Sequence, residues 1–102
     1  LYGTLHWYND RHVSSGKKIS CSVAQFHNYS VEWDNDSIKW FLDGSRYHGV
    51  CIKDSINSTS ECHKPHYIIL NLAIGGDWPK NPDEFTLFPD TVFVDYVRVY
   101  QK

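Results

Sequence analysis

The chain has no methionine and almost no net charge. The small charge limits the kinds of partner that we expect, and the missing initiator methionine fits a piece of a longer protein. Twelve acidic and ten basic residues leave a formal charge of -2, so nothing indicates nucleic acid or an anionic membrane as a partner. No apolar run approaches the roughly 20 residues of a membrane span. The chain opens at Leu1 with strand-like sequence and without a signal peptide, so we expect a piece of a longer protein.

Cysteine is scarce and odd in number, with Cys21, Cys51 and Cys62. The C-x-x-C spacing of a zinc knuckle is missing. Cys51 and Cys62 flank a polar loop, so they either pair in an oxidising compartment or remain free thiols. The six histidines are scattered and form no H-E-x-x-H motif, which favours surface histidines over a transition-metal site.

Helical periodicity is also nearly absent, and alternation with period two takes its place. The pattern predicts strands over residues 2–8, 26–33, 38–42, 46–52, 67–74 and 91–100, with residues 19–23 as a shorter candidate. Residues 9–18, 53–64 and 75–89 read as loops. Because Asp34–Ser37 forms a turn signal between two strands, a hairpin is expected there. The fold class predicted is an all-β antiparallel sandwich in one domain.

Motifs for catalysis are weak. Ser, His and Asp residues occur without a nucleophile elbow. Glu32 and Asp34 lie two residues apart beside Trp33, a spacing compatible with acid–base chemistry. A salt-bridged hairpin edge is the interpretation we favour for them.

Aromatic residues are abundant, at 16% of the chain. Trp33, Trp40 and Phe41 fall in strands and are predicted to be core. Trp78 instead follows Gly75-Gly76 in an irregular loop, where it is either a platform for a sugar ring or an anchor of the loop. Asn71 interrupts an apolar strand, and a buried amide there would bond neighbouring strands or hold sugar hydroxyls.

Five motifs occur in register along the chain. They are Gly3-Thr-Leu-His6, Phe26-His-x-Tyr-x-x-Glu-Trp33, Ile38-Lys-Trp-Phe-x-Asp-Gly44, the Pro65–Pro82 stretch and Val94-Asp-Tyr-Val-Arg-Val-Tyr100. Together they resemble the C-terminal half of glycoside hydrolase family 16, in its laminarinase-like (endo-β-1,3-glucanase) branch. The resemblance implies a concanavalin A-like β jelly-roll, of which residues 1–102 form the C-terminal part of a single catalytic domain.

The resemblance also implies an activity, namely retaining hydrolysis of β-1,3 or mixed β-1,3-1,4 glucans by a secreted enzyme. The family's catalytic E-x-D-x-x-E strand lies just upstream of the strand that opens this chain. We therefore assign no catalytic residue, and we expect the chain alone to be inactive. The partners expected are a β-glucan and the missing N-terminal half of the domain. A non-catalytic β-glucan-binding protein of the same fold is the alternative, and a packing module joined to a partner chain is the third hypothesis.

The resemblance further implies a substrate-binding wall made of His6, Tyr8, Asn71 and Trp78. No cofactor is required. Asp95 matches a position whose backbone carbonyl helps to hold a structural calcium in some members. Lys80 departs from the family's usual glycine, so a turn with positive φ would be strained there by about 1 kcal/mol. Cys62 stands at a position that is often apolar, which suits a buried thiol.

Overall fold

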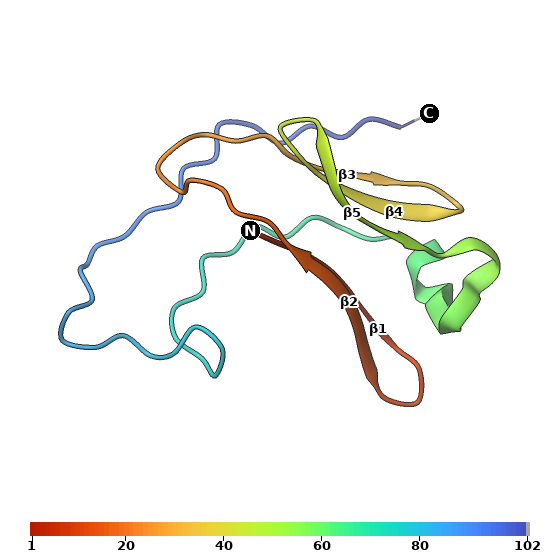
Figure 1. Ribbon diagram of the computed structural model, residues 1–102, viewed down its shortest axis with the longest axis horizontal. Coiled ribbons are helices and arrows are strands. Elements are labelled where there is room, and N and C mark those ends of the chain that lie inside the picture. The colour runs from red at the N-terminus through yellow and green to blue at the C-terminus, as the bar shows by residue number, and fades with distance from the viewer. Residues whose placement is uncertain (102) are drawn as a thin grey trace. The chain divides into compact units, whose positions relative to one another are not determined.

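The computed structural model describes residues 1–101. It divides into two compact units, Leu1–His66 and Tyr67–Lys102. All regular secondary structure among the described residues belongs to the first unit (Figure 1). Each unit is described separately below.

The first sheet of this unit is a two-stranded ribbon. β1 (Tyr2–Tyr8) pairs antiparallel with β2 (His12–Lys18) over their whole length. The loop predicted over residues 9–18 is therefore wrong beyond the turn, because the polar residues of β2 find a complete row of backbone partners on β1. The strand suggested for residues 19–23 is also wrong: Ile19 N–H still donates to the Leu1 carbonyl at 3.0 Å, and the pairing ends there.

The second sheet is a three-stranded meander of β3 (Tyr29–Trp33), β4 (Ser37–Leu42) and β5 (Ser45–Cys51). The predicted hairpin is confirmed. Its turn is closed by the Asp34 carboxylate, whose Oδ1 accepts the backbone N–H groups of Asp36 at 2.8 Å and Ser37 at 2.7 Å. β4 and β5 are joined by Asp43 and Gly44, both at positive φ, as a tight two-residue hairpin turn requires.

The polar segment after β5, predicted as a loop, contains short 3₁₀ turns, η1 (Lys53–His63), which are interrupted by a kink where residues 54–59 depart from helical dihedral angles. Asp54, Ser55, Asn57 and Ser58 adopt positive φ, which short polar residues tolerate better than branched ones. Within the described residues, no helix combines the length and the apolar character needed to cross a membrane.

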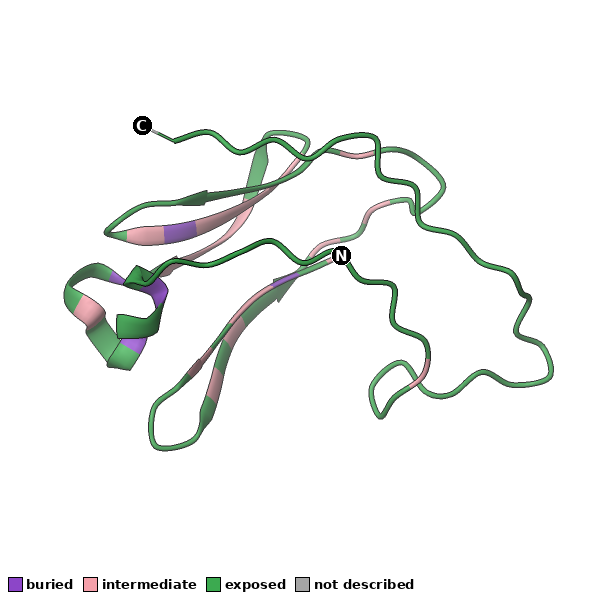
Figure 2. Ribbon diagram, turned by 180° about the vertical axis from the view of Figure 1, so that it is seen from behind, coloured by how far each residue is buried: buried purple, intermediate pink, exposed green. Residues whose placement is uncertain are grey.

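The core of the first unit is small. Ile38 on β4, Ile52 after β5 and Cys62 on η1 are buried, and Leu5, Trp40 and Val50 pack against them. Figure 2 shows that the buried stretches of the ribbon are short. Gly3 lets β1 approach closely, since a Cβ at this position would lie 2.6 Å from Tyr47 Oη and 2.9 Å from the Trp40 ring.

The second unit has no regular secondary structure among its described residues. None of the described residues from 67 to 101 belongs to a strand, so the strands predicted over residues 67–74 and 91–100 are wrong in this structure. Alternating apolar sequence forms a strand only where another strand supplies a ladder of backbone partners, and no strand among the described residues pairs with these segments. In the second of these segments, Phe93 and Val99 are each 75% exposed. The all-β antiparallel class is confirmed by the five strands of the first unit.

Candidate functional site

A hollow of about 200 Å³ opens where β1, β3, β4 and η1 meet. Its apolar lining is Leu5, Ile38 and Cys62, which are buried or half-buried. Its exposed lining is His6, Trp33, Glu61 and His66. This surface, called here the His6 hollow, combines an apolar floor with rings and polar atoms at its rim, as small-ligand sites commonly do.

Two aromatic rings define one side of the His6 hollow. The Trp33 and His66 ring centroids lie 5.0 Å apart at an interplanar angle of 54°. His66 is held in place because its Nε2 lies 3.0 Å from the Glu61 carbonyl oxygen. Trp33 is 46% exposed, so its predicted place in the core is wrong. The reason is that β3 is an edge strand whose five residues are all exposed.

His6 also lines the hollow, and a second histidine contacts it. His6 Nδ1 lies 2.9 Å from His12 Nε2, and the ring centroids are 5.1 Å apart at 18°. The strand register places His12 opposite Tyr8, one step diagonally from His6. The Tyr8 hydroxyl donates to the Asp10 carbonyl at 3.2 Å, and Tyr8 does not line the hollow.

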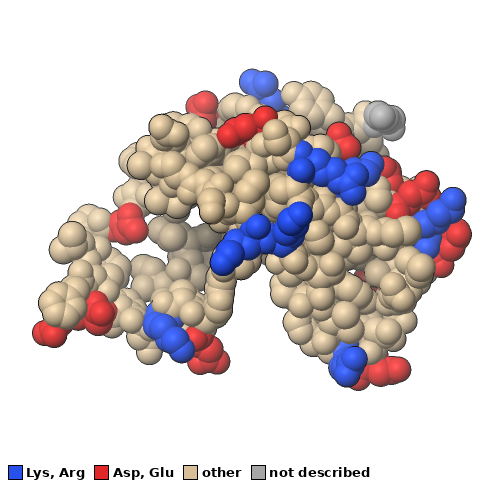
Figure 3. Space-filling view, viewed as in Figure 1, with Lys and Arg blue, Asp and Glu red and all other residues tan. Residues whose placement is uncertain are grey.

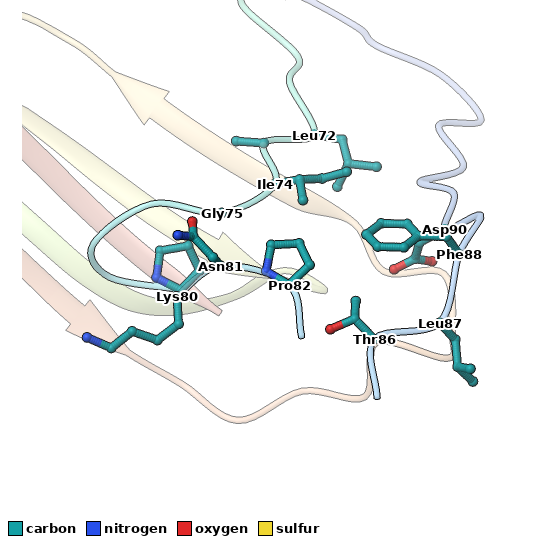
Figure 4. Close-up of a pocket in the computed structure, with 12 residues that line it drawn as sticks. Leu72, Ile74, Gly75, Lys80, Asn81, Pro82, Thr86, Leu87, Phe88 and Asp90 are labelled. Atoms are coloured by element: carbon teal, nitrogen blue, oxygen red, sulfur yellow. The ribbon is translucent and has the colours of Figure 1, made fainter. Parts of the chain in front are cut away.

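The second unit has its own pocket of about 240 Å³ (Figure 4). Leu72 and Ile74 line it from the extended segment, and Phe88 and Asp90 line it from the later part of the chain. Gly75 and Gly76 both have positive φ, and the Asn81 side-chain oxygen accepts the Gly76 N–H at 3.3 Å. Sequence reasoning missed Asn81, although an amide five residues after a glycine pair is a recognisable partner for the turn.

Asn71 and Trp78 both belong to the second unit, whereas His6 and Tyr8 both belong to the first. Asn71 is exposed, so the expectation that its amide is buried is wrong, and its role in holding sugar hydroxyls stays a prediction. Trp78 is 73% exposed, and neither residue lines the pocket. Lys80 has φ 70°, the left-handed region in which we expected a lysine to be strained, and its N–H donates to the Gly76 carbonyl at 3.0 Å.

The charged side chains of Glu32 and Asp34 form ion pairs with Lys39 at the edge of the β3–β4 hairpin, rather than an acid–base pair. Lys39 Nζ lies 3.4 Å from Asp34 Oδ2 and 3.8 Å from Glu32 Oε2, which confirms the salt-bridged edge. The backbone N–H of Asp36, and then that of Ser37, hold the pKa of Asp34 below its usual value. On the face shown in Figure 3, both signs of charge are dispersed among large uncharged areas. Such a surface suits a neutral ligand.

The structure bears on the alternatives for the cysteines and on possible metal ligands. All three cysteines are free, so of the two alternatives the free thiols are confirmed. Cys62 is buried, as its apolar position suggested, and burial raises the pKa of its thiol. Residues 1–101 contain no group of three or more His, Cys, Asp or Glu side chains arranged for a metal ion. Asp95 is exposed, and calcium at its carbonyl stays a prediction.

Comparisons with known proteins find one matching protein family, several relatives in sequence and a similar solved structure. Residues 6–102 match the family described as "Beta-glucan synthesis-associated protein SKN1/KRE6/Sbg1". The clotting factor G alpha subunit of Tachypleus tridentatus is 38% identical over 97% of this chain and 15% of its own length. The β-glucanase of Rhodothermus marinus is 30% identical over 99% of this chain and 39% of its own length. The solved endo-β-1,3-glucanase of Pyrococcus furiosus superposes with a TM-score of 0.55 at 30% identity, over 86% of this chain and 37% of that one. The chain thus spans well under half of each relative.

Proposed function

We propose a role in β-glucan recognition, from the premise that this chain belongs to the SKN1/KRE6/Sbg1 family of β-glucan synthesis-associated proteins, which is related to glycoside hydrolase family 16. The observation that carries the proposal is the His6 hollow. An exposed indole at its rim suits the apolar face of a pyranose ring, and imidazole nitrogens beside it suit the hydroxyls. Trp78, the exposed aromatic of the second unit, is proposed as a further contact for the polysaccharide.

The whole protein is proposed to cleave internal β-1,3 or mixed β-1,3-1,4 linkages outside the cell. The resemblance to glucanases supports this activity. This chain would supply binding without cleavage. A retaining glycosidase needs two carboxyl groups about 5–5.5 Å apart across the sugar. In the described residues, the neighbouring pair Glu32 and Asp34 is held by Lys39, and Glu61 in the hollow is ion-paired with Lys64 at 2.9 Å.

A soluble β-1,3-glucan oligosaccharide, titrated into the chain and followed by NMR shifts, tests the binding role. We expect shifts centred on the His6 hollow, and weaker binding after Trp33→Ala or Trp78→Ala. Losing one aromatic contact of about 0.5–1.5 kcal/mol corresponds to roughly a two- to twelvefold rise in Kd. Phe85→Ala is the matched control, because Phe85 is 79% exposed and lines neither cavity. Unchanged affinity in both tryptophan variants would contradict the proposal.

The second candidate is a glucan-binding protein without hydrolytic activity. Its support is the family description, which speaks of β-glucan synthesis rather than hydrolysis. An activity assay on the whole protein distinguishes the two candidate functions. Turnover of laminarin that depends on both glutamates of an E-x-D-x-x-E strand supports the enzyme, and binding without turnover supports the binder. In either case the isolated chain is expected to release no sugar above the uncatalysed background.

A further inference from the structure

We propose that Asn57 is an N-glycosylation site, which takes an oligosaccharide on its side-chain nitrogen during secretion. The chain contains three Asn-x-Ser/Thr sequons, which begin at Asn28, Asn35 and Asn57. A sequon of this kind is an acceptor for N-linked glycans in secreted proteins, where it lies in a surface segment. The inference rests on the extracellular location in the proposed function, and it does not depend on glucan binding.

The side chain of Asn57 is free to carry a bulky group. It is exposed, and none of the hydrogen bonds within residues 1–101 involves it. The backbone around it is fixed, because the Asn57 carbonyl accepts the Trp7 indole N–H at 2.8 Å. Its φ of 54° lies in the left-handed region, which asparagine tolerates. Asn57 does not line the His6 hollow, so a glycan attached to it starts outside the proposed glucan site.

Thr59 supplies the hydroxyl of this sequon, and the fold buries it. Thr59 is 1% exposed, and its hydroxyl donates to the Ile56 carbonyl at 2.6 Å. The glycosyl transferase must therefore recognise Thr59 before η1 forms, while the chain is still being translocated. Folding then places Thr59 inside and leaves Asn57 outside. A glycan that is added early therefore stays compatible with the folded structure.

The modification is a glycosyl transfer from a lipid-pyrophosphate-linked oligosaccharide. The side-chain nitrogen of Asn57 attacks the anomeric carbon of the first sugar, and the bond from this carbon to the phosphate oxygen breaks. The lipid pyrophosphate leaves with the electron pair, and the nitrogen gives one proton to the transferase. No oxidant or reductant takes part. Ile56 and Ser58, on either side of Asn57, carry no charge that would oppose this anionic donor.

The other two sequons are poorer acceptors. The Asn28 N–H donates to Asp43 Oδ1 at 2.8 Å, and the Asn28 carbonyl accepts the Asp43 N–H at 2.9 Å. These bonds belong to a meander of local hairpins, which form within about 1–10 μs and compete with recognition by the transferase. Asn35 has Asp34 and Asp36 on either side, and their negative charges oppose the pyrophosphate of the donor.

Cell-free translation of the full chain behind a cleavable signal peptide, with microsomes present, tests the inference. A reporter sequon in an added C-terminal tail identifies the molecules that were translocated, whether or not they fold. We expect these molecules to carry a second glycan. Its enzymatic removal in ¹⁸O-water should convert residue 57 to labelled aspartate, which mass spectrometry detects. Translocated chains without a glycan at Asn57, or with glycan mainly at Asn28 or Asn35, would overturn the inference.

Matched variants assign the glycan to this sequon. Asn57→Asp and Thr59→Ala should each lose the second glycan, whereas Thr59→Ser, which keeps the hydroxyl, should retain it. Asn35→Asp is the control and should also retain it. In the whole protein purified from its source, an extracellular product without glycan at Asn57 contradicts the inference alone, and a product kept inside the cell contradicts the proposed location as well. Failure to bind β-glucan would contradict the proposed function and leave the glycan assignment standing.

Discussion

His27 joins two parts of the first unit through a pair of short hydrogen bonds. Its Nδ1 lies 2.7 Å from Asp43 Oδ2, and its Nε2 lies 2.9 Å from the Ser22 carbonyl oxygen. Because both nitrogens face acceptors, the doubly protonated ring satisfies both contacts. The hydrogen bond to Asp43 raises the pKa of His27. The Asn28 backbone N–H, and then His27, lower the pKa of Asp43.

The signs of these shifts set a pH window. A raised pKa at His27 stabilises the fold fully below the unfolded value of about 6.5, and the contribution is lost as pH rises through the folded pKa. A lowered pKa at Asp43 stabilises the fold above about 3.8, and the contribution is lost as pH falls through the folded pKa. The pair is therefore most stabilising between roughly pH 4 and 6.5.

We expect Asp43→Asn to lower the pKa of His27 and to reduce the free energy of unfolding at pH 5.5 more than at pH 8.5. Asparagine keeps the shape and tolerates the positive φ of this position. NMR titration of His27 and urea unfolding at both pH values measure the two effects. Asp36→Asn, in the other hairpin turn, is the control. An equal loss of stability at both pH values would show that the charge of Asp43 is irrelevant.

Individual residues were predicted well where the signal was local. The salt-bridged role of Glu32 and Asp34 follows from nearby sequence, and the structure confirms it. Trp33 and Asn71 were misjudged because burial depends on which other elements cover a strand. Alternation tells which residues share a face, but it does not tell whether that face is covered.

Strands were predicted correctly where nearby turn residues define them, and wrongly where they depend on pairing with a distant segment. The meander β3–β4–β5 was predictable because two turn signals, Asp34–Ser37 and Asp43-Gly44, set its register. β2 was missed because its polar residues become a strand only through pairing with β1. The segments 67–74 and 91–100 were overpredicted for the converse reason, since a strong strand pattern does not create a partner.

A substitution at Gly3 tests the contact between β1 and the β3–β4–β5 meander, because Gly3 lies against Tyr47 and Trp40. We expect Gly3→Ala to destabilise the first unit by about 1–3 kcal/mol, because the new methyl group would overlap Tyr47 and Trp40. Urea unfolding followed by far-UV circular dichroism measures the change. Ser20→Ala, an exposed position outside the strands, serves as the control. Equal stability of Gly3→Ala and wild type would mean that β1 moves away without cost.

At the scale of the whole molecule, the second unit leaves the large hydrophobic side chains of residues 67–74 and 92–100 exposed. Exposed apolar strand-like segments favour association.

We expect the full chain to bind an apolar dye such as ANS and to show a mass that increases with concentration in size-exclusion chromatography with light scattering. The first unit alone, residues 1–66, holds the buried core and all the strands that the structure describes, so it should keep its β-sheet spectrum with less dye binding and less association. A full chain that stays monomeric at all concentrations and binds no dye would contradict this expectation.

The turn at Lys80 has the backbone conformation that usually goes with glycine, although the side chain there is a lysine. The family resemblance places glycine there, yet lysine occupies the same left-handed dihedral region. The path of this loop is therefore set by its surroundings, including the bond from Lys80 N–H to the Gly76 carbonyl and the Asn81 amide on Gly76. Position 80 is thus open to variation in charge and size while the backbone stays in place. Such a position lets a lineage, or a directed-evolution library, change the chemistry of a loop without redesigning its shape.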